Sequence, residues 1–277
     1  MRINTNTASI NIYREYSKNL IKQSSSLQRI SSGIKINSAK EDPNGIAKSE
    51  RFRMQIRGLQ MAGNNCQDGA SMLQTAEGGL DGITSSLQRV RELLVQAGGA
   101  TTDSDKKDIQ SEINQMLAGA NDMANNTEFN GVKLLSGGKN DGTSTLKMVT
   151  GANVGEKVDI PIYNLTTAVE GLNLTSVDVN KTDESLNSLD NAIKVIVGAR
   201  SKFGALENRF QSSYDSITQI SDKTQAVESG IRDTDIATEM VEYSKDNILI
   251  EAGTAMMVQS NQLPQDALKV LENIRSR

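Results

Sequence analysis

The chain has 277 residues and a formal net charge of −4, and only 3% of its residues are aromatic, with no Trp among them. A compact globule of this size usually buries several large rings, so the composition favours a thin, helical protein. The charge argues against non-specific nucleic-acid binding, no run of about 18 apolar residues could span a membrane, and the absence of His removes the commonest general base and His-ligated zinc.

The first predicted helix runs from about residue 9 to Gly33, with capping candidates in residues 4–7. Apolar side chains recur along it at alternating three- and four-residue spacing, which predicts a narrow seam for another helix to cover. This seam consists of Tyr13, Tyr16, Leu20, Leu27, Ile30 and Ile34. Residues 1–7 lack an apolar stretch and a small-residue cleavage site, so we expect no cleaved secretory signal.

Two further helices are predicted after Pro43, which breaks the chain. We expect one over about 45–76, a loose joint at Gly78-Gly79, and a second from Leu80 to Gly98-Gly99. A fourth helix should then bury a single apolar stripe. That stripe consists of Ile109, Ile113, Met116, Ala120 and Met123.

The pattern changes between about residues 131 and 175, where Gly and Asn become frequent and helical spacing disappears. Three short strands are predicted there. They cover residues 132–135, 146–149 and 157–162. Gly137-Gly138 and Asn140–Gly142 favour hairpin turns, and Pro161 should lie at an edge or a strand end because it has no N–H to donate.

Helical spacing returns at about Asp183 and continues to Ile231, and a joint near Gly230 and Asp233 precedes the last helix. The last helix carries a second narrow seam. This seam consists of Ile236, Met240, Tyr243, Ile250 and Met257. Neither terminal seam has a core of its own, so we expect the two seams to be covered by each other and by copies of the same chain.

The order of elements predicts a mainly α fold: an elongated antiparallel helical bundle or coiled coil formed by the N- and C-terminal halves, with a small β-hairpin region in the middle. Residues 1–44 and 235–277 would be terminal helices that are disordered in a monomer and become ordered on polymerisation. Residues 45–130 and 176–234 would form a helical rod. Residues 131–175 would form the β-hairpin region, with no large surface insert.

The sequence offers little for catalysis. Asp233 and Asp235 could form an acid/base pair, but no nucleophile motif accompanies them, and the glycine pairs are typical of helix joints rather than phosphate loops. The single Cys66 lies on an apolar helical stripe, which favours a small buried thiol over an intermolecular link. We therefore expect no enzyme, no cofactor and no metal.

Several pieces of the sequence share their order and spacing with one family. They are INTN at 3–6, LQRISSG at 27–33, INSAK at 36–40, QTAEG at 74–78, LQRVREL at 87–93, FNGVKLL at 129–135, GALENRF at 204–210 and AMMVQSN at 255–261. Together they resemble bacterial flagellin, the subunit of the flagellar filament, over nearly the whole chain. The resemblance implies a short form without large surface domains.

The resemblance implies a structural protein that polymerises into the extracellular filament of the bacterial flagellum and serves motility. It implies export through the flagellar type III apparatus without a cleaved signal, and terminal seams that form the inner filament core. The implied partners are copies of the same chain, an export chaperone at the C-terminal helix, the filament cap and hook-junction proteins. Thr143, Ser144 and Thr145 are candidate O-glycosylation sites.

The resemblance also implies recognition by Toll-like receptor 5 through an exposed helix. The matching residues are Gln88, Arg89, Arg91, Glu92, Leu93 and, on the following helix, Glu112. The alternative is a solvated helix face that also makes subunit contacts, because Arg and Glu on helices are usually exposed. For the whole chain, the alternatives are a hook–filament junction protein and a secreted coiled-coil effector, and seeded polymerisation into long tubes distinguishes a filament subunit from both.

Overall fold

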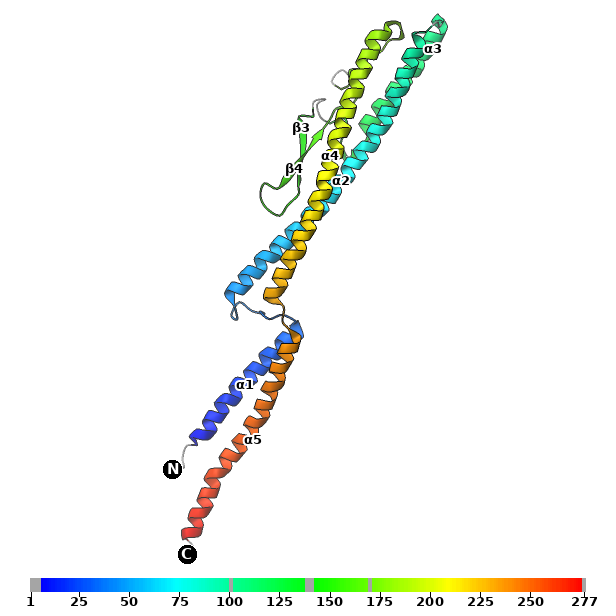
Figure 1. Cartoon of the computed structure of the whole chain (residues 1–277). Coiled ribbons are helices and arrows are strands. Elements are labelled where there is room, and N and C mark those ends of the chain that lie inside the picture. Colours follow the sequence, from blue (N-terminus) through cyan, green and yellow to red (C-terminus); the bar gives the residue numbers. More distant parts are fainter. Residues whose placement is uncertain (1–5, 100–101, 138–141, 169–170, 276–277) are drawn as a thin grey trace. The chain divides into compact units, whose positions relative to one another are not determined.

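The computed structural model describes residues 6–99, 102–137, 142–168 and 171–275, with the backbone alone for 267, 268 and 270–275 (Figure 1). These residues contain five α-helices, one short 3₁₀ helix and two antiparallel hairpins, which confirms a mainly α fold with a small β region. The helices are α1 (Thr7–Ser32), α2 (Pro43–Ala97), α3 (Asp103–Asn126), η1 (Val179–Lys181), α4 (Thr182–Arg232) and α5 (Ile236–Arg275). The strands are β1 (Glu128–Phe129), β2 (Val132–Lys133), β3 (Ser144–Val149) and β4 (Lys157–Ile162).

The chain divides into two compact units, and the boundaries between them fall inside α2 and α4. Residues 55–223 form the first, named the core unit below. Residues 1–54 together with 224–277 form the second, named the terminal unit.

In the core unit, α2 is one continuous helix across Gly78-Gly79, and the predicted joint there is wrong. A glycine inside a helix costs about 1 kcal/mol relative to Ala. The apolar stripe nevertheless keeps its register through this point, with Leu80 and Ile83 completely buried. Burial of such side chains gains roughly 1.5–3 kcal/mol each and outweighs the two glycine penalties.

The apolar core of the described residues lies between α2, α3 and α4, which run side by side in Figure 1. The stripe that α3 buries differs from the predicted one. Leu117 and Ala124 are buried, whereas Met116 and Met123 are half-buried at its flank. The difference arises because the prediction followed a 3.5-residue repeat, while a straight helix of 3.6 residues per turn drifts away from it.

The first hairpin pairs β1 with β2 through the two-residue turn Asn130-Gly131. Both turn residues have positive φ, 50° and 77°, as the type I′ turn requires, and Asn-Gly is the strongest sequence signal for it. The predicted turn lay later, around residues 137–142, of which 138–141 are outside the described residues. The predicted strand 132–135 is shorter than expected, because Leu134 and Leu135 leave it to enter the core.

The second hairpin pairs β3 with β4, a pairing that the sequence did not predict, because its turn signals lay between residues 137 and 142. Both strands were predicted, although β3 begins two residues earlier than expected. Among the described residues, each of these strands pairs on one side only, so Pro161 lies on an edge strand, as expected. The hairpin lies along α2, where Asn65 Nδ2 donates to the Val149 carbonyl at 3.0 Å. A Cβ at Gly69 would stand 2.7 Å from Met148 Sδ and 3.0 Å from Phe210 Cζ, so this glycine permits the close approach.

The segment between β4 and α4 closes the core without any inserted domain. Leu165 and Leu174 are almost completely buried, and the Leu165 N–H donates to the Leu135 carbonyl at 2.8 Å. The Gln110 side chain of α3 accepts from the Val179 N–H at 2.9 Å. These contacts fix the return of the chain into α4.

In the terminal unit, α1 and α5 lie antiparallel and side by side (Figure 1). The Asn6 side chain caps α1 by accepting from the Ser9 N–H at 3.2 Å, and its Nδ2 donates to the Ser260 carbonyl at 2.9 Å. Further along, Gln23 Nε2 donates to Asn247 Oδ1 at 2.9 Å. The two contacts with α5 fix the antiparallel alignment.

Backbone hydrogen bonds hold the end of α1 against the joint between α4 and α5. α1 ends at Gly33, whose left-handed φ of 69° turns the chain. The Thr234 N–H donates to the Gly33 carbonyl at 3.0 Å, and the Lys35 N–H donates to the Arg232 carbonyl at 2.7 Å. The predicted joint between the last two helices is confirmed at this place.

The Arg232 side chain adds a clasp between α4 and the start of α2. Its guanidinium donates to Glu50 Oε1 at 2.9 Å and to Ser49 Oγ at 3.2 Å. Ser49 is buried and donates in turn to Glu228 Oε1 at 3.0 Å. The hydrogen bond from Arg232 lowers the pKa of Glu50 below its ordinary value of 4.5.

Gly78→Ala should stabilise the chain by about 0.5–1 kcal/mol, because Ala is the better helix former and nothing lies within 4 Å of a Cβ at this position. Gly79→Ala should instead destabilise it by roughly 1–3 kcal/mol, since its Cβ would stand 2.5 Å from Thr127 Oγ1 and 3.0 Å from Leu135 Cδ1. Urea unfolding followed by circular dichroism measures both. If both alanines stabilise equally, the close packing at Gly79 is wrong.

Glu50→Gln should weaken the terminal unit at about pH 7, and this deficit should shrink as the pH falls below 4.5. Because the folded pKa of Glu50 is lowered, its ion pair stabilises the fold above pH 4.5 and is lost as the pH falls through the lowered pKa. Thermal unfolding of both proteins across this range measures the difference, which should be small because the pair lies at the surface. Glu251→Gln, at an exposed position of α5, serves as the control. A deficit that persists at low pH would contradict the assignment.

Candidate assembly surface

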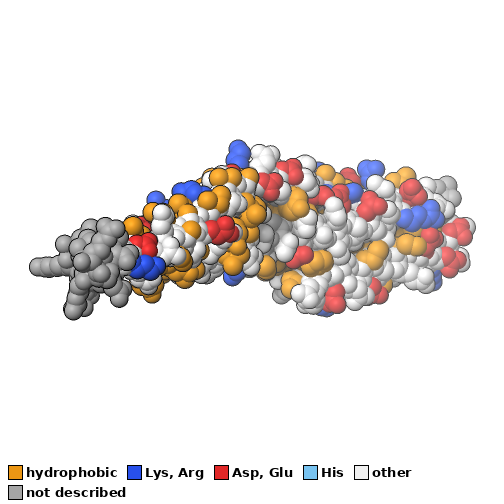
Figure 2. Space-filling view, turned by 90° about the horizontal axis from the view of Figure 1, so that it is seen from below, with side chains coloured by type: hydrophobic (Ala, Val, Ile, Leu, Met, Phe, Trp, Pro, Cys, Tyr) orange, Lys and Arg blue, Asp and Glu red, His pale blue; other side chains and the backbone are white. Residues whose placement is uncertain are grey.

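The terminal unit carries many of its large apolar side chains on the outside. Leu27 is 54% exposed and Ile21 is 71% exposed. Figure 2 shows such hydrophobic side chains at the surface among charged ones. The exposed apolar residues are Ile10, Tyr13, Leu20, Ile21 and Leu27 on α1, and Ile236, Met240, Val241, Ile248, Leu249, Met256, Val258 and Leu263 on α5. These two sets are named the outer rows below.

The most deeply buried side chains of α1 and α5 are polar. They are Ser26 on α1 and Glu239, Asp246 and Ser260 on α5. Arg29 Nη1 lies 3.7 Å from Glu239 Oε1, an ion pair that is too long for a hydrogen bond. Among the described residues, no apolar side chain of this unit reaches the same degree of burial.

The two predicted seams lie at the border between the buried and the outer faces. Their half-buried members are Tyr16, Ile30, Ile34, Tyr243, Ile250 and Met257, and their exposed members are Tyr13, Leu20, Leu27, Ile236 and Met240. The seams therefore cover each other only in part. The reason is that α1 and α5 contact each other around Ser26 and Asp246, to one side of the seams. About half of the seam residues therefore face outward.

The outer rows have the properties of an interaction surface. Covering a single Leu or Ile with a neighbour is worth roughly 1.5–3 kcal/mol, and apolar patches rimmed by polar groups mark protein–protein contacts. A groove of about 490 Å³ runs along the outer face of α1, lined by Leu20, Ile21, Leu27 and Tyr243 among others. Its apolar lining fits another apolar helix better than a charged ligand.

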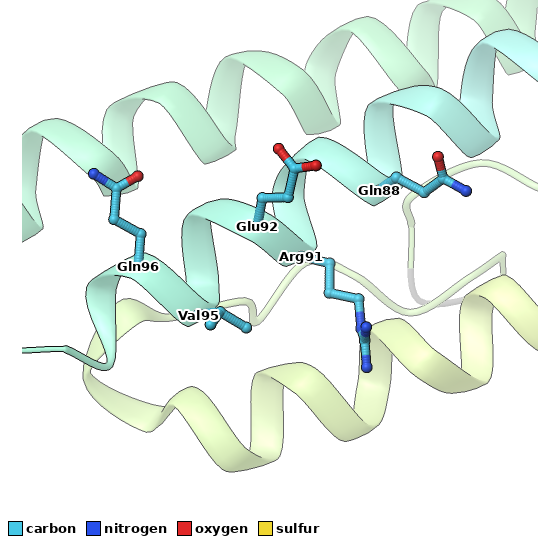
Figure 3. Close-up of a pocket in the computed structure, with 5 residues that line it drawn as sticks. All are labelled: Gln88, Arg91, Glu92, Val95 and Gln96. Atoms are coloured by element: carbon cyan, nitrogen blue, oxygen red, sulfur yellow. The ribbon is translucent and has the colours of Figure 1, made fainter.

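A second exposed surface lies on α2 and α3 around Arg89. Its guanidinium is 3.0 Å from Glu112 Oε1 on α3 and 3.2 Å from Glu92 Oε2, and these two carboxylates, Glu112 first, raise the pKa of Arg89. Beside it is a groove of about 640 Å³ whose described lining residues all belong to α2, and Arg91 and Val95 project from this helix (Figure 3). The structure thus brings together most of the residues that the sequence grouped here.

Leu93 is the exception within that group. It is only 2% exposed and packs in the core with Val90, so it is not available to a partner on this surface. Gln88, Glu92 and the other members are exposed or half-exposed and stay candidates. The sequence grouped Leu93 with the exposed residues of this helix, but the apolar core of the unit extends to it.

The remaining predicted residues are the single cysteine and the three candidate glycosylation sites. Cys66 is 1% exposed, which confirms a buried thiol, and its burial raises its pKa. Thr143 and Thr145 are exposed at the start of β3, where Ser144 is half-buried. Modification at these three positions stays a prediction.

Neither a metal centre nor a membrane span is found in the described part of the chain. No cluster of three or more His, Cys, Asp or Glu side chains there could hold a metal ion. None of its helices is both long and apolar enough to cross a membrane.

Sequence reasoning missed two sets of residues in the terminal unit. Ile10, Ile21 and Val241 widen the outer rows, and apolar residues flanking each seam were the available signal for them. The buried Asp246 and Glu239 gave no signal, because a carboxylate on a helix is usually exposed.

Among solved structures, the fold is similar to that of a Vibrio parahaemolyticus protein described as flagellar hook-associated. The likeness covers 70% of this chain and 100% of that chain, with a TM-score of 0.58 and 17% identity. At this identity the match shows the fold alone.

Sequence comparisons give the family. Residues 3–140 match the bacterial flagellin N-terminal helical region, and residues 186–271 match the bacterial flagellin C-terminal helical region. The chain is 37% identical to the flagellin of Bacillus subtilis over 303 aligned positions, and 36% identical to the flagellar filament 33 kDa core protein of Treponema phagedenis over 285. Each alignment covers 98% of this chain and 100% of the relative. The chain therefore belongs to the bacterial flagellin family.

Proposed function

We propose that this chain is a structural subunit that polymerises into the filament of the bacterial flagellum. The observation that carries the proposal is the outward apolar surface of the terminal unit, which a single chain leaves uncovered. The full-length similarity to named flagellins and flagellar filament core proteins supports it. The function is mechanical, and the chain serves motility as a building block outside the cell rather than as an enzyme.

The outer rows suit an open assembly. They lie on both α1 and α5, so each subunit offers apolar surface on more than one side. Contacts between unlike surfaces that do not close into a ring propagate as a helix. In this proposal the terminal helices form the inner filament core and gain most of their order from neighbouring copies.

Other partners belong to the proposal through the family. Before assembly the exposed rows of α5 need protection, which a chaperone at the C-terminal helix supplies during type III export. At the growing end and at the base, the filament cap and the hook-junction proteins meet the same terminal unit. The outward Met256 and Leu263 are the residues of α5 on which such contacts would rest.

A hook–filament junction protein is the main alternative. The similarity in fold to a hook-associated protein is compatible with it, but at 17% identity that likeness carries no functional weight. The sequence relatives that align over their full length are named as flagellins or filament core proteins. A filament subunit is therefore the better supported function.

We also propose that the surface around Arg89 is recognised by Toll-like receptor 5. Arg89 is held in place by Glu112 and Glu92 while its side chain stays about half exposed, 48%. A pre-ordered Arg beside an open groove is a favourable interface anchor, because little side-chain entropy is lost on binding. A solvated helix face that only contacts other subunits is the alternative.

Ile21→Ser with Leu27→Ser should abolish the growth of long tubes from filament seeds, because the double variant removes roughly 3–6 kcal/mol of apolar burial per subunit. Thermal unfolding of the core unit should not change. Electron microscopy and circular dichroism measure the two results.

The matched control is Met61→Ser with Val197→Ser, which removes apolar side chains of similar exposure, 61% and 54%, from the core unit. This control should still add to seeds. Equal loss of growth in both variants, or normal tubes from the terminal variant, would show that the outer rows do not carry assembly.

Arg89→Ala should weaken receptor binding by the monomer by about tenfold or more, as expected for an interface anchor. Its effect on folding should be small, because the ion pair with Glu112 is exposed. Arg209→Ala, at an exposed position of α4, is the control and should bind like the unmodified chain. Surface plasmon resonance with the receptor ectodomain measures this, and unchanged affinity of the Arg89 variant removes the residue from the proposal.

A further inference from the structure

Between α1 and α5 lies a set of polar side chains that the assembly proposal does not use. Ser26 and Asp246 are each 4% exposed, and Glu239 and Ser260 are each 7% exposed. Arg29 extends along Glu239, and Asn6 binds Ser260 through its side chain. Asn6, Ser26, Arg29, Glu239, Asp246 and Ser260 are named the polar register set.

These groups are incompletely paired within the chain. Arg29 Nε and Glu239 Oε1 are buried and have no hydrogen-bond partner. Next to them is a cavity of about 240 Å³, lined by Lys22, Ser26, Arg29, Glu242, Lys245 and Asp246 among others. Lys22, Glu242 and Lys245 in its wall are exposed, so this cavity is open to solvent and water reaches the polar side chains beside the buried pair.

A wet, charged contact contributes little to stability. The cost of removing charges from water offsets most of the attraction between them, and well-packed apolar residues at the same places usually give a more stable pair. The same contact is selective, because sliding one helix along the other would bury Asp246 and Glu239 against partners that do not match. The outer rows, by contrast, are exposed in the single chain and contribute little to the alignment of α1 against α5.

We infer that the polar register set fixes the alignment of α1 against α5 at the expense of the strength of the pair. In a single chain, α1 and α5 are therefore held together weakly. When neighbouring copies cover the outer rows, the two helices stay in one register. The role of this contact in assembly rests on the proposed polymerisation. The fixed register and the weakness of the pair are properties of a single chain.

The geometry supplies a direct reporter of the register. A Cβ at Gly253 would stand 3.8 Å from the Cβ of Tyr16, which is the mean Cβ–Cβ separation of a disulfide. Tyr16→Cys with Gly253→Cys therefore reports the native register. Ile12→Cys with Gly253→Cys reports a slip of about one helical turn, since Ile12 lies four residues before Tyr16 on α1. Cys66→Ala in both backgrounds removes the buried thiol.

The test compares two backgrounds of the full chain in glutathione redox buffer. In the native background, the in-register pair should form its disulfide at least about tenfold more than the slipped pair, a preference of ~1.4 kcal/mol. In the apolar background, Ser26→Ala, Arg29→Met, Glu239→Met and Asp246→Leu, that preference should fall to about threefold or less. Both members of the Arg29 ion pair change together, so no lone charge is left buried.

Hydrogen exchange of residues 7–32 measures the strength of the pair in the single chain without the added cysteines. Exchange should be at least about tenfold slower in the apolar background, because apolar residues replace the polar contact. Arg14→Met with Glu251→Met makes a comparable change at exposed positions of α1 and α5 and should leave exchange unaltered.

Each outcome bears on the inference. An undiminished preference for the in-register disulfide in the apolar background overturns the alignment claim, as does equal formation of both disulfides in the native background. Exchange that is not slowed overturns the claim that the pair is weak. Failure of the native chain to grow from seeds would overturn the proposed polymerisation alone, since the disulfide and exchange readouts do not depend on it.

Discussion

The burial of apolar side chains is the constraint on which the organisation of this chain depends. Among the described residues, every fully buried apolar side chain belongs to the core unit, from Leu59 to Ile217. The core unit thus contains the burial that an independent fold needs, supplied by α2, α3, α4 and the segment that follows β4. The terminal unit has only half-buried apolar side chains, such as Tyr16 and Ile250, and helices whose apolar face is not fully covered are marginal in water.

Polar contacts have a different role in the two units. In the core unit, exposed ion pairs such as Arg200 with Glu77 and Asp81 join helices that apolar packing has already placed. Pairs of this kind add little stability. In the terminal unit the polar contacts come first, because hydrogen bonds at Asn6 and Gln23 and the clasp at Arg232 are the main directional contacts between its helices. Alignment and stability therefore have separate sources there.

Much of this fold could be predicted from the sequence, because helical spacing depends on local periodicity. The terminal helices, the start of α4, β4 and the edge position of Pro161 all followed from spacing and turn chemistry. The joint at Gly78-Gly79 failed because local propensity competes with the burial of a long stripe, and burial won. The inward face of α1 and α5 could not be predicted, since periodicity gives the spacing of a stripe but not the direction from which a partner approaches. Leu93 was misplaced for the same reason.

The separation of stability from alignment suits a subunit that must stay single before it assembles and remain fixed afterwards. If the buried face between α1 and α5 were apolar, the pair would be satisfied within one chain and free to slide, and neighbouring copies would add little. With polar residues such as Asp246 buried between the helices and apolar residues such as Leu27 facing outward, much of the apolar free energy of the terminal unit is released only when other copies arrive. The strength of the assembled state then depends on neighbours, while its geometry is already encoded within each subunit.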